Sequence, residues 1–215
     1  MIVELKNVSK KYNDQYIFKN INLQVKDHEM LAIVGQSGCG KSTLLNMIGL
    51  LDKPDDGTVS LFDSQNVKPF TRQSQKILKN DIGYLFQNYA LIENETIYYN
   101  LDIVLKRQKN KEELMTNVLK QVGLDIDLHK KIYQCSGGEQ QRIALARLLL
   151  KPCRLILADE PTGNLDENNK IKIFEILKGL YKQGKTVIIV THDKELAASC
   201  PQIIEIKNHQ LIKIK

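Results

Sequence analysis

No stretch of the 215 residues approaches the roughly 18 consecutive apolar residues that a membrane-spanning helix needs. The first six residues, Met-Ile-Val-Glu-Leu-Lys, also lack the apolar segment of a secretory signal peptide. The four cysteines are scattered without a C-x-x-C pair, which argues against a disulfide framework or a cysteine metal site. These absences predict a soluble, cytoplasmic chain with reduced thiols. Its length is sufficient for one large domain.

The chain also lacks internal repeats and a concentrated patch of charge. Its formal net charge is +6, and 26 of its 31 basic residues are lysines spread along the sequence. They cluster only at 106–111 and 129–131, where a solvated face is a simpler interpretation than a nucleic-acid or membrane surface. No segment interleaves aromatic and basic residues to stack bases. We therefore expect no direct nucleic-acid partner.

A glycine-rich segment at 35–42, Gly-Gln-Ser-Gly-Cys-Gly-Lys-Ser, matches the phosphate-binding pattern G-x-x-x-x-G-K-[ST]. The apolar run 31–34 predicts a buried strand before it, and residues 42–48 predict a helix after it, as the motif requires. Glycine backbone and a helix N-terminus suit phosphate oxygens. Lys41 would reach the β- and γ-phosphates, and Ser42 would hold Mg²⁺. A chance match in a glycine-rich turn is the alternative.

Alternating apolar and polar residues predict antiparallel strands near the start of the chain. The segments 3–5 and 21–25 alternate in this way, as strands with one wet face do, and 58–62 repeats the pattern. The polar segment 63–80 is poorly periodic. Tyr12, in a turn-like segment, is either a packing residue at a strand end or a flat surface for a nucleobase.

Two continuous apolar runs end in polar side chains. Residues 82–86 predict a buried strand followed by Gln87, and residues 186–190 predict another that is followed by His192. The carboxyl ends of such strands are where ligands bind in open α/β sheets. An ordinary loop glutamine and a buried or capping histidine are the alternatives.

A third run, 154–160, predicts a buried strand that ends in two adjacent carboxylates, Asp159 and Glu160. Successive residues of a strand point in opposite directions, but at its end the chain is free to turn both towards a ligand. Asp159 is a candidate Mg²⁺ ligand, and Glu160 is a candidate to orient and deprotonate an attacking water. A helix cap is the structural alternative.

Residues 89–150 follow a helical pattern instead. Leu114, Val118 and Val122 recur on one face with Leu119 beside them, and Gly123 follows where that helix would end. Ser136 and Glu139 form an S-x-x-E capping box at the start of a later helix.

The two residues between them, Gly137 and Gly138, weaken a helix by roughly 1 kcal/mol each. Because a cap alone does not require them, we interpret this bare backbone as a second helix end that faces phosphate.

The last part of the chain predicts one helix and one hairpin. Gly184 would end the helix, and residues 203–206 and 211–214 would form the hairpin. The predicted buried face of the helix consists of Ile171, Phe174, Leu177 and Tyr181.

Taken together, these segments resemble the nucleotide-binding subunit of ABC transporters over essentially the whole chain. The resemblance implies an α/β fold with a P-loop NTPase (RecA-like) core, an N-terminal antiparallel β subdomain and an inserted α-helical signature subdomain. It implies a single ATPase domain over 1–215. The core and β subdomain would occupy about 1–88 and 151–215, and the helical subdomain about 89–150.

The resemblance also implies the site residues, with ATP and Mg²⁺ as cofactors. Catalytic roles fall on Glu160, His192, Gln87 and Lys41. Metal ligation falls on Ser42, Gln87 and Asp159. The implied nucleotide contacts are Tyr12, Gly35, Ser37, Gly38, Cys39, Gly40, Lys41, Ser42, Thr43, Ser136, Gly138, Glu139 and Asp166, the last in the segment that contacts the other subunit.

One residue departs from the family signature. Cys135 stands where the family usually has leucine before Ser-Gly-Gly. Because cysteine is small and apolar, we expect looser packing beneath the helix start, with Ser136 and Gly138 still facing phosphate.

Members of this family pack head to tail, so that Ser136 and Gly138 of a second copy would complete the ATP site at Lys41 and Ser42. The resemblance therefore implies an ATP-dependent homodimer. It would drive a transmembrane permease subunit and lie at the inner face of the cell membrane.

The segments 49–54 and 159–166 resemble compact cassettes whose permeases carry a large extracytoplasmic domain. This favours an exporter of a peptide, lipoprotein or hydrophobic compound. The alternatives are a non-transport ABC ATPase, acting in translation, DNA repair or cell-division signalling, and a hydrolysis-deficient scaffold. The single cassette argues against the first, and Glu160 with His192 argues against the second.

Overall fold

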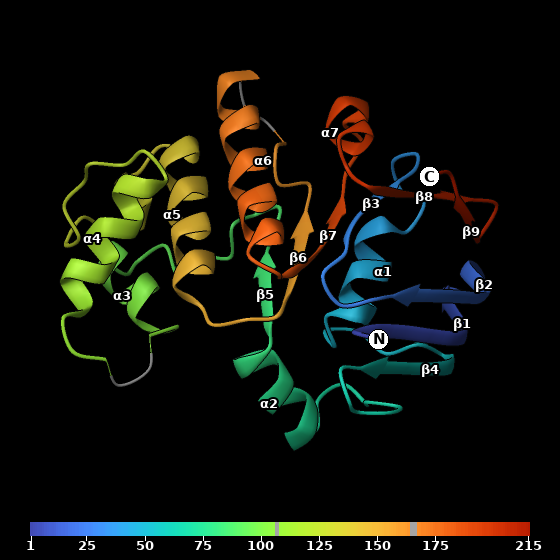
Figure 1. The fold of residues 1–215 in the computed structure, drawn as a ribbon. Helices are drawn as coiled ribbons and strands as arrows, with labels where there is room; N and C mark the ends of the chain where they lie inside the picture. Colours follow the sequence, from blue (N-terminus) through green and yellow to red (C-terminus); the bar gives the residue numbers. More distant parts are fainter. Residues whose placement is uncertain (106–107, 164–166) are drawn as a thin grey trace.

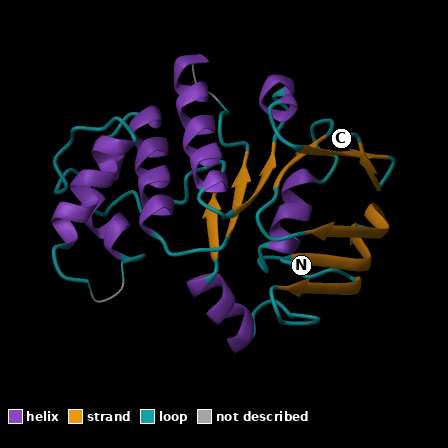
Figure 2. Cartoon of the chain, viewed as in Figure 1, coloured by secondary structure: helices purple, strands orange, loops and turns teal. Residues whose placement is uncertain are grey.

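The computed structural model describes residues 1–105, 108–163 and 167–215, which form two sheets and the helices around them (Figures 1 and 2). The smaller sheet is antiparallel, in the order β2-β1-β4. Its strands are β1 (Val3–Tyr12), β2 (Gln15–Val25) and β4 (Asp56–Leu61). The predicted antiparallel start of the chain is confirmed.

The larger sheet has the order β5-β6-β7-β3-β8-β9. Its first five strands are parallel and β9 is antiparallel to β8, so the predicted terminal hairpin is confirmed. The strands are β3 (Met30–Val34), β5 (Ile82–Leu85), β6 (Leu155–Asp159), β7 (Thr186–Val190), β8 (Gln202–Lys207) and β9 (Gln210–Lys213).

Both faces of the sheet are buried at β3, β5, β6 and β7, which explains why these strands are largely continuous apolar runs. In β7, Val187 and Ile189 pack into one hydrophobic core, and Ile188 and Val190 into another. The first core includes residues of α3 (Ile97–Asp102), α4 (Lys111–Gln121), α5 (Gly137–Leu150), α6 (Glu167–Lys182) and α7 (Lys194–Ala198). The second core includes residues of α1 (Lys41–Ile48), α2 (Arg72–Asn80) and the smaller sheet.

The predicted helical segment lies between β5 and β6 and contains α3, α4, a short 3-10 helix at Ile132–Gln134 and α5. Its helices stand beside α6 at one side of the larger sheet (Figure 1). Gly123 has a φ of 75° and ends α4 as predicted, because glycine adopts this left-handed conformation without steric cost.

Two helix faces need correction, and α2 has no counterpart among the predictions. The poorly periodic segment 63–80 contains α2 at Arg72–Asn80, behind a Thr71–Ser74 capping box. The buried residues of α4 are Met115 and Leu119, and the predicted Val122 is buried at its C-cap, whereas the predicted Leu114 and Val118 are half-buried. In α6 the predicted Ile171 is 61% exposed, and the buried residues are Ile173, Leu177 and Leu180. Phe174 and Tyr181 flank that face, half-buried.

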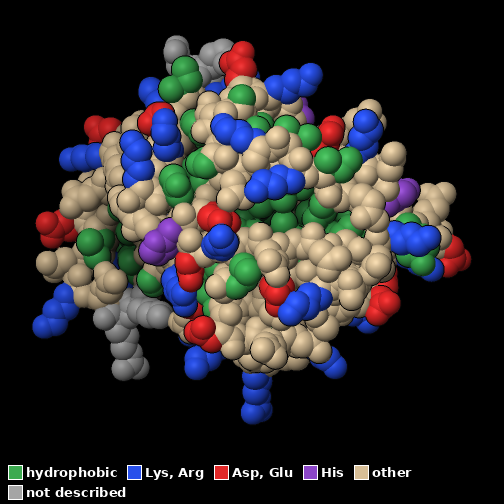
Figure 3. Space-filling model, turned by 45° about the vertical axis from the view of Figure 1, so that its right-hand side comes forward, with side chains coloured by type: hydrophobic (Ala, Val, Ile, Leu, Met, Phe, Trp, Pro, Cys, Tyr) green, Lys and Arg blue, Asp and Glu red, His purple; other side chains and the backbone are tan. Residues whose placement is uncertain are grey.

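The surface agrees with a dispersed charge, because basic and acidic side chains alternate over the face shown in Figure 3. Within the described ranges, none of the helices has the length and apolar composition that crossing a membrane requires. All four cysteines are free thiols, and only Cys39 is not fully buried.

Candidate active site

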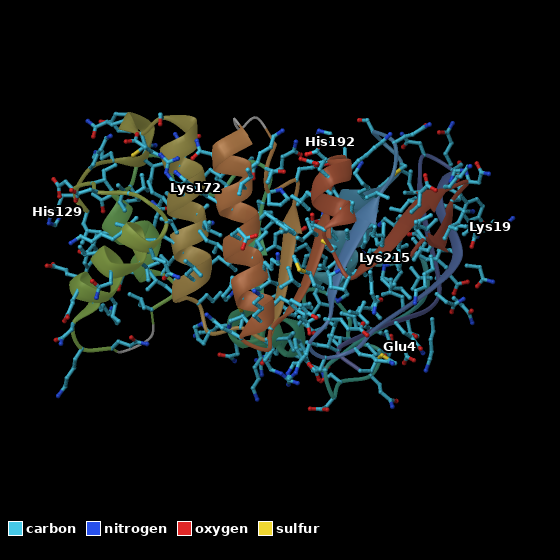
Figure 4. All side chains as sticks on the ribbon, turned by 45° about the horizontal axis from the view of Figure 1, so that its top comes forward. Glu4, Lys19, His129, Lys172, His192 and Lys215 are labelled. Carbon is cyan, nitrogen blue, oxygen red and sulfur yellow. The ribbon has the colours of Figure 1, made fainter. Side chains whose placement is uncertain are left out.

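The carboxyl ends of β3, β5, β6 and β7 lie at the same edge of the larger sheet, because these neighbouring strands are parallel. The loops that leave this edge enclose a cavity of about 450 Å³. Figure 4, turned to bring this edge forward, shows His192 beside α7. The cavity is lined by Ser37, Gly38, Gly40, Lys41, Ser42, Thr43, Gln87, Glu160, Gly163 and His192. The sequence predicted all of these except Gly163.

The loop between β3 and α1 depends on glycine at its end. Gly40 has a φ of 103°, and a Cβ atom there would lie 2.4 Å from Ile17 Cγ2. The ammonium of Lys41 folds back over this loop and donates to the carbonyl oxygens of Gly35 at 3.0 Å and Gln36 at 3.2 Å. This cation therefore lies beside the loop that leads into α1, and the N-terminus of a helix also favours an anion. Cys39 is half-buried and packs against the second core.

Ser42 and Asp159 meet at the floor of the site. The Ser42 hydroxyl donates to Asp159 Oδ1 at 3.0 Å, and Asp159 is 8% exposed. Burial raises the pKa of Asp159, and the repulsion from Glu160 adds to this effect, while the Ser42 hydrogen bond opposes it. The paired hydroxyl and carboxylate oxygens are the hard ligands that Mg²⁺ prefers.

The backbone changes direction at Glu160, the residue directly after β6. Its φ is 46°, a left-handed conformation that is uncommon for a residue other than glycine. Oε2 of its carboxylate accepts from the backbone N–H of His192 at 3.2 Å and lies 2.8 Å from His192 Nδ1. Oε1 lies 3.9 Å from Lys41 Nζ. The turn after this strand thus brings the Glu160 carboxylate into the cavity, whereas Asp159 does not line it and contacts the cavity residue Ser42.

Tyr12 does not line the cavity. It lies at the end of β1 with its side chain 49% exposed, and its hydroxyl donates to Asp52 Oδ2 at 2.6 Å. This hydrogen bond raises the pKa of Tyr12. Asp52 also accepts from the buried ammonium of Lys10 at 2.7 Å. No local pattern in the sequence indicates these two contacts, because their partners are 40 and 42 residues apart.

The predicted second phosphate-facing segment lies elsewhere on the molecule. Ser136 and Glu139 form the predicted capping box at the start of α5, but neither of them nor Gly138 lines the cavity. Space around Gly137 is open, and a Cβ atom on Gly138 would meet only Arg142 Nη1 at 3.6 Å. One chain therefore presents two separate helix N-termini with bare backbone.

Cys135 is buried beneath this helix start, and burial raises the pKa of its thiol. Its sulfur lies 3.6 Å from the carbonyl oxygen of Lys131 and belongs to the first core. Asp166, the remaining predicted contact, lies outside the described residues, as do the two neighbours before it.

The parallel sheet with a glycine loop before α1, a lysine over that loop and carboxylates at the adjacent strand end defines a P-loop nucleotide hydrolase. The family model described as ABC transporter matches residues 18–163. The chain belongs to this family, and it is an ATP-binding cassette ATPase.

Individual relatives agree with this assignment. The chain is 37% identical over 222 residues to the uncharacterized ABC transporter ATP-binding protein MJ1508 of Methanocaldococcus jannaschii, covering 99% of both chains. It superposes with a TM-score of 0.90 on the ATP-binding cassette MJ0796, solved as a dimer in a post-hydrolysis state bound to ADP and Pi. That match has 37% sequence identity and covers 100% of this chain and 99% of the other. The predicted fold class is confirmed.

The chain is also 39% identical over 217 residues to the macrolide export ATP-binding/permease protein MacB of Campylobacter jejuni. This match covers 98% of the chain and 34% of MacB. The chain thus spans about a third of the length of the MacB relatives that it matches.

Proposed function

We propose that the chain binds ATP with the phosphates on the loop before α1 and the base against Tyr12, and that hydrolysis of this ATP drives a partner permease. The observation that carries the proposal is the convergence on one cavity of Lys41, at the start of α1, with Glu160 and His192, which follow β6 and β7. The remaining phosphate-loop contacts would come from Gly35, Ser37, Gly38, Cys39, Gly40, Ser42 and Thr43.

Ser42, Asp159 and Gln87 would hold Mg²⁺. The 3.0 Å contact between Ser42 Oγ and Asp159 Oδ1 supports this, and Gln87 adds an amide oxygen from the same cavity. When bound, the ion neutralises charge on the phosphate oxygens.

Glu160 is the general base of the reaction. Its carboxylate takes a proton from the attacking water while the water oxygen bonds to the γ-phosphorus and the bond to the bridging oxygen of ADP breaks. His192 fixes the Glu160 carboxylate through two contacts on one oxygen. Lys41 exchanges its two carbonyl partners for phosphate oxygens and stabilises the charge that develops on them.

A second copy of the chain would complete each ATP site. Ser136, Gly138 and Glu139 lie away from the cavity of their own chain, and the bare helix N-terminus that they form suits phosphate. We therefore propose an ATP-dependent head-to-tail dimer in which these residues, and Asp166, act across the interface. The dimeric state described for MJ0796 supports this arrangement.

The transport role rests on the relatives. The likeness to MacB, described as a macrolide export protein, supports a partner permease and export of a peptide, lipoprotein or hydrophobic compound. The chain would then lie at the inner face of the cell membrane through that permease, without a direct nucleic-acid partner.

Glu160→Gln tests the catalytic assignment in the full chain. We expect ATP binding to remain, phosphate release to slow by about 10² to 10⁴, as for other lost general bases, and an ATP-bound dimer to accumulate in size-exclusion chromatography. Glu195→Gln, at an exposed position three residues after His192, is the matched control and should retain activity. Removing Mg²⁺ with EDTA should stop wild-type turnover. Full turnover by Glu160→Gln would refute the proposed role.

A further inference from the structure

Gln141 is an almost completely buried amide on the inner face of α5. It is 2% exposed, although glutamine is usually a surface residue. Its Nε2 donates to the carbonyl oxygen of Pro161, the residue directly after Glu160. The helix that begins with Ser136 and Gly138 is thus bonded to the loop that carries Glu160.

The loop that receives this bond needs support. Glu160 holds a left-handed φ of 46°, which costs free energy for a side chain with a Cβ atom. Its own N–H donates to Val190 O at 2.9 Å, and its carbonyl accepts from Gly163 N at 3.0 Å. These bonds fix the turn before and after Glu160, and the hydrogen bond from Gln141 fixes the next peptide.

The contacts of Gln141 indicate which of its atoms matters. Among the described residues, Oε1 of the side chain has no hydrogen-bond partner, although it is buried. A buried amide that is only half satisfied costs free energy that an apolar side chain of similar size would avoid. The contact that offsets this cost is the donation to Pro161.

The same helix also holds the other active-site loop. The guanidinium of Arg147, further along α5, donates to the carbonyl oxygens of Tyr89 and Ala90 at 2.7 Å each, just beyond Gln87. Backbone carbonyls of the Glu160 loop and the Gln87 loop are therefore both bonded to α5, which makes α5 the element against which the two loops are placed.

We propose that Gln141 is a positioning residue for ATP hydrolysis: by holding the Pro161 carbonyl it places the Glu160 carboxylate, so the location of α5 sets the geometry of the catalytic base. This inference rests on the proposed role of Glu160. The start of α5 then influences the catalytic base as well as the phosphates. A displacement of Ser136 and Gly138 also moves Gln141, because all three belong to the same rigid helix and its cap.

The test replaces the amide by apolar side chains of similar volume, Gln141→Met and Gln141→Leu, in the full chain. We expect both variants to bind ATP with a Kd within about twofold of wild type. We also expect kcat to fall by about 10², the loss that a misplacement of about 1 Å causes. Gln121→Met, on the exposed end of α4, is the matched control and should retain full kcat.

A double-mutant cycle with Glu160→Gln separates positioning from a general loss of structure. Because Gln141 acts through the Glu160 carboxylate, adding Gln141→Met to Glu160→Gln should change the single-turnover rate by less than about twofold. The same loss in both backgrounds, or a wild-type kcat in Gln141→Met, would overturn the inference. A wild-type chain that does not hydrolyse ATP would instead contradict the proposed function.

Discussion

A single carboxylate, Asp52, connects a buried lysine to the exposed ring of Tyr12. One oxygen accepts from Lys10 Nζ at 2.7 Å and the other from the Tyr12 hydroxyl at 2.6 Å. Burial raises the pKa of Asp52, but the hydrogen bonds from Lys10 and Tyr12 outweigh burial and hold this pKa below its ordinary value. Asp52 therefore stabilises the fold in its ionised form and also orients the proposed base-stacking side chain.

Asp52→Asn should lower the free energy of unfolding at pH 7 by about 2 kcal/mol, because two hydrogen bonds to a charged group are weakened. A carboxyl group with a lowered pKa in the folded state stabilises above its unfolded pKa and loses this effect as the pH falls through the folded value. The difference between wild type and Asp52→Asn should thus stay constant from pH 7 to about pH 5 and shrink at lower pH. Urea unfolding followed by circular dichroism measures it, and a difference that disappears near pH 6 would contradict this account.

At the residue scale, the sequence predicted the residues that line the cavity far better than the residues that hold those side chains in place. Lys41, Ser42 and Glu160 occur in short motifs whose spacing carries the chemistry. Asp52 and Gln141 have partners 40 and 20 residues away in the chain, and neither spacing has a local signature. The contacts of Asp52 and Gln141 are visible only in the folded structure, where the strands bring their partners close.

At the scale of elements, continuous apolar runs were easier to interpret than helix faces. Every run predicted as a strand of the larger sheet is one, because burial on both faces leaves little choice of side. In α4, adjacent apolar pairs such as Leu114–Met115 and Val118–Leu119 fit two faces equally well, and packing on α5 decides between them. Ser74 and Ile77 are the buried residues of α2, too few for a periodic signal.

Gly57, in β4, packs closely against the backbone of β1. Gly57 has a φ of 84°, and a Cβ atom on it would lie 2.4 Å from the backbone oxygen of Asn7 and 2.5 Å from that of Lys6. Gly57→Ala combines left-handed strain with a clash against backbone that cannot rotate away. We expect it to lower the free energy of unfolding by roughly 2 to 4 kcal/mol.

Gly123→Ala is the matched control, because Gly123 has a similar φ of 75° but nothing within 4 Å of an added Cβ atom. It should cost about 1 kcal/mol, the left-handed strain alone. Urea unfolding of both variants measures the difference, and equal losses would show that the contact of β4 with β1 adds nothing.

For the whole molecule, the two helix starts that we propose to face phosphate do not line the same cavity within one chain. Lys41 and Ser42 line the cavity, whereas Ser136 and Gly138 belong to the helical layer beyond α6 (Figure 1). The sequence predicted both segments as phosphate-facing, but their separation in one subunit follows from the layered fold. Under the proposed head-to-tail dimer, each segment therefore belongs to a different one of the two ATP sites.

This division can be tested by mixing two inactive variants, Lys41→Ala and Gly138→Asp, the second of which presents a carboxylate to the phosphates and fits the open space at that position. Each homodimer has two defective sites. In a heterodimer both defects fall in the same site and the other site is intact. An equal mixture forms heterodimers in about half of its dimers and should recover up to about a quarter of wild-type ATPase activity.

A chain that carries both substitutions is the control. It should be inactive by itself. It should also stay inactive when mixed with Lys41→Ala, because every site in that mixture lacks the lysine. If the Lys41→Ala and Gly138→Asp mixture also stays inactive although the chains still dimerise, the two segments do not act independently across the interface.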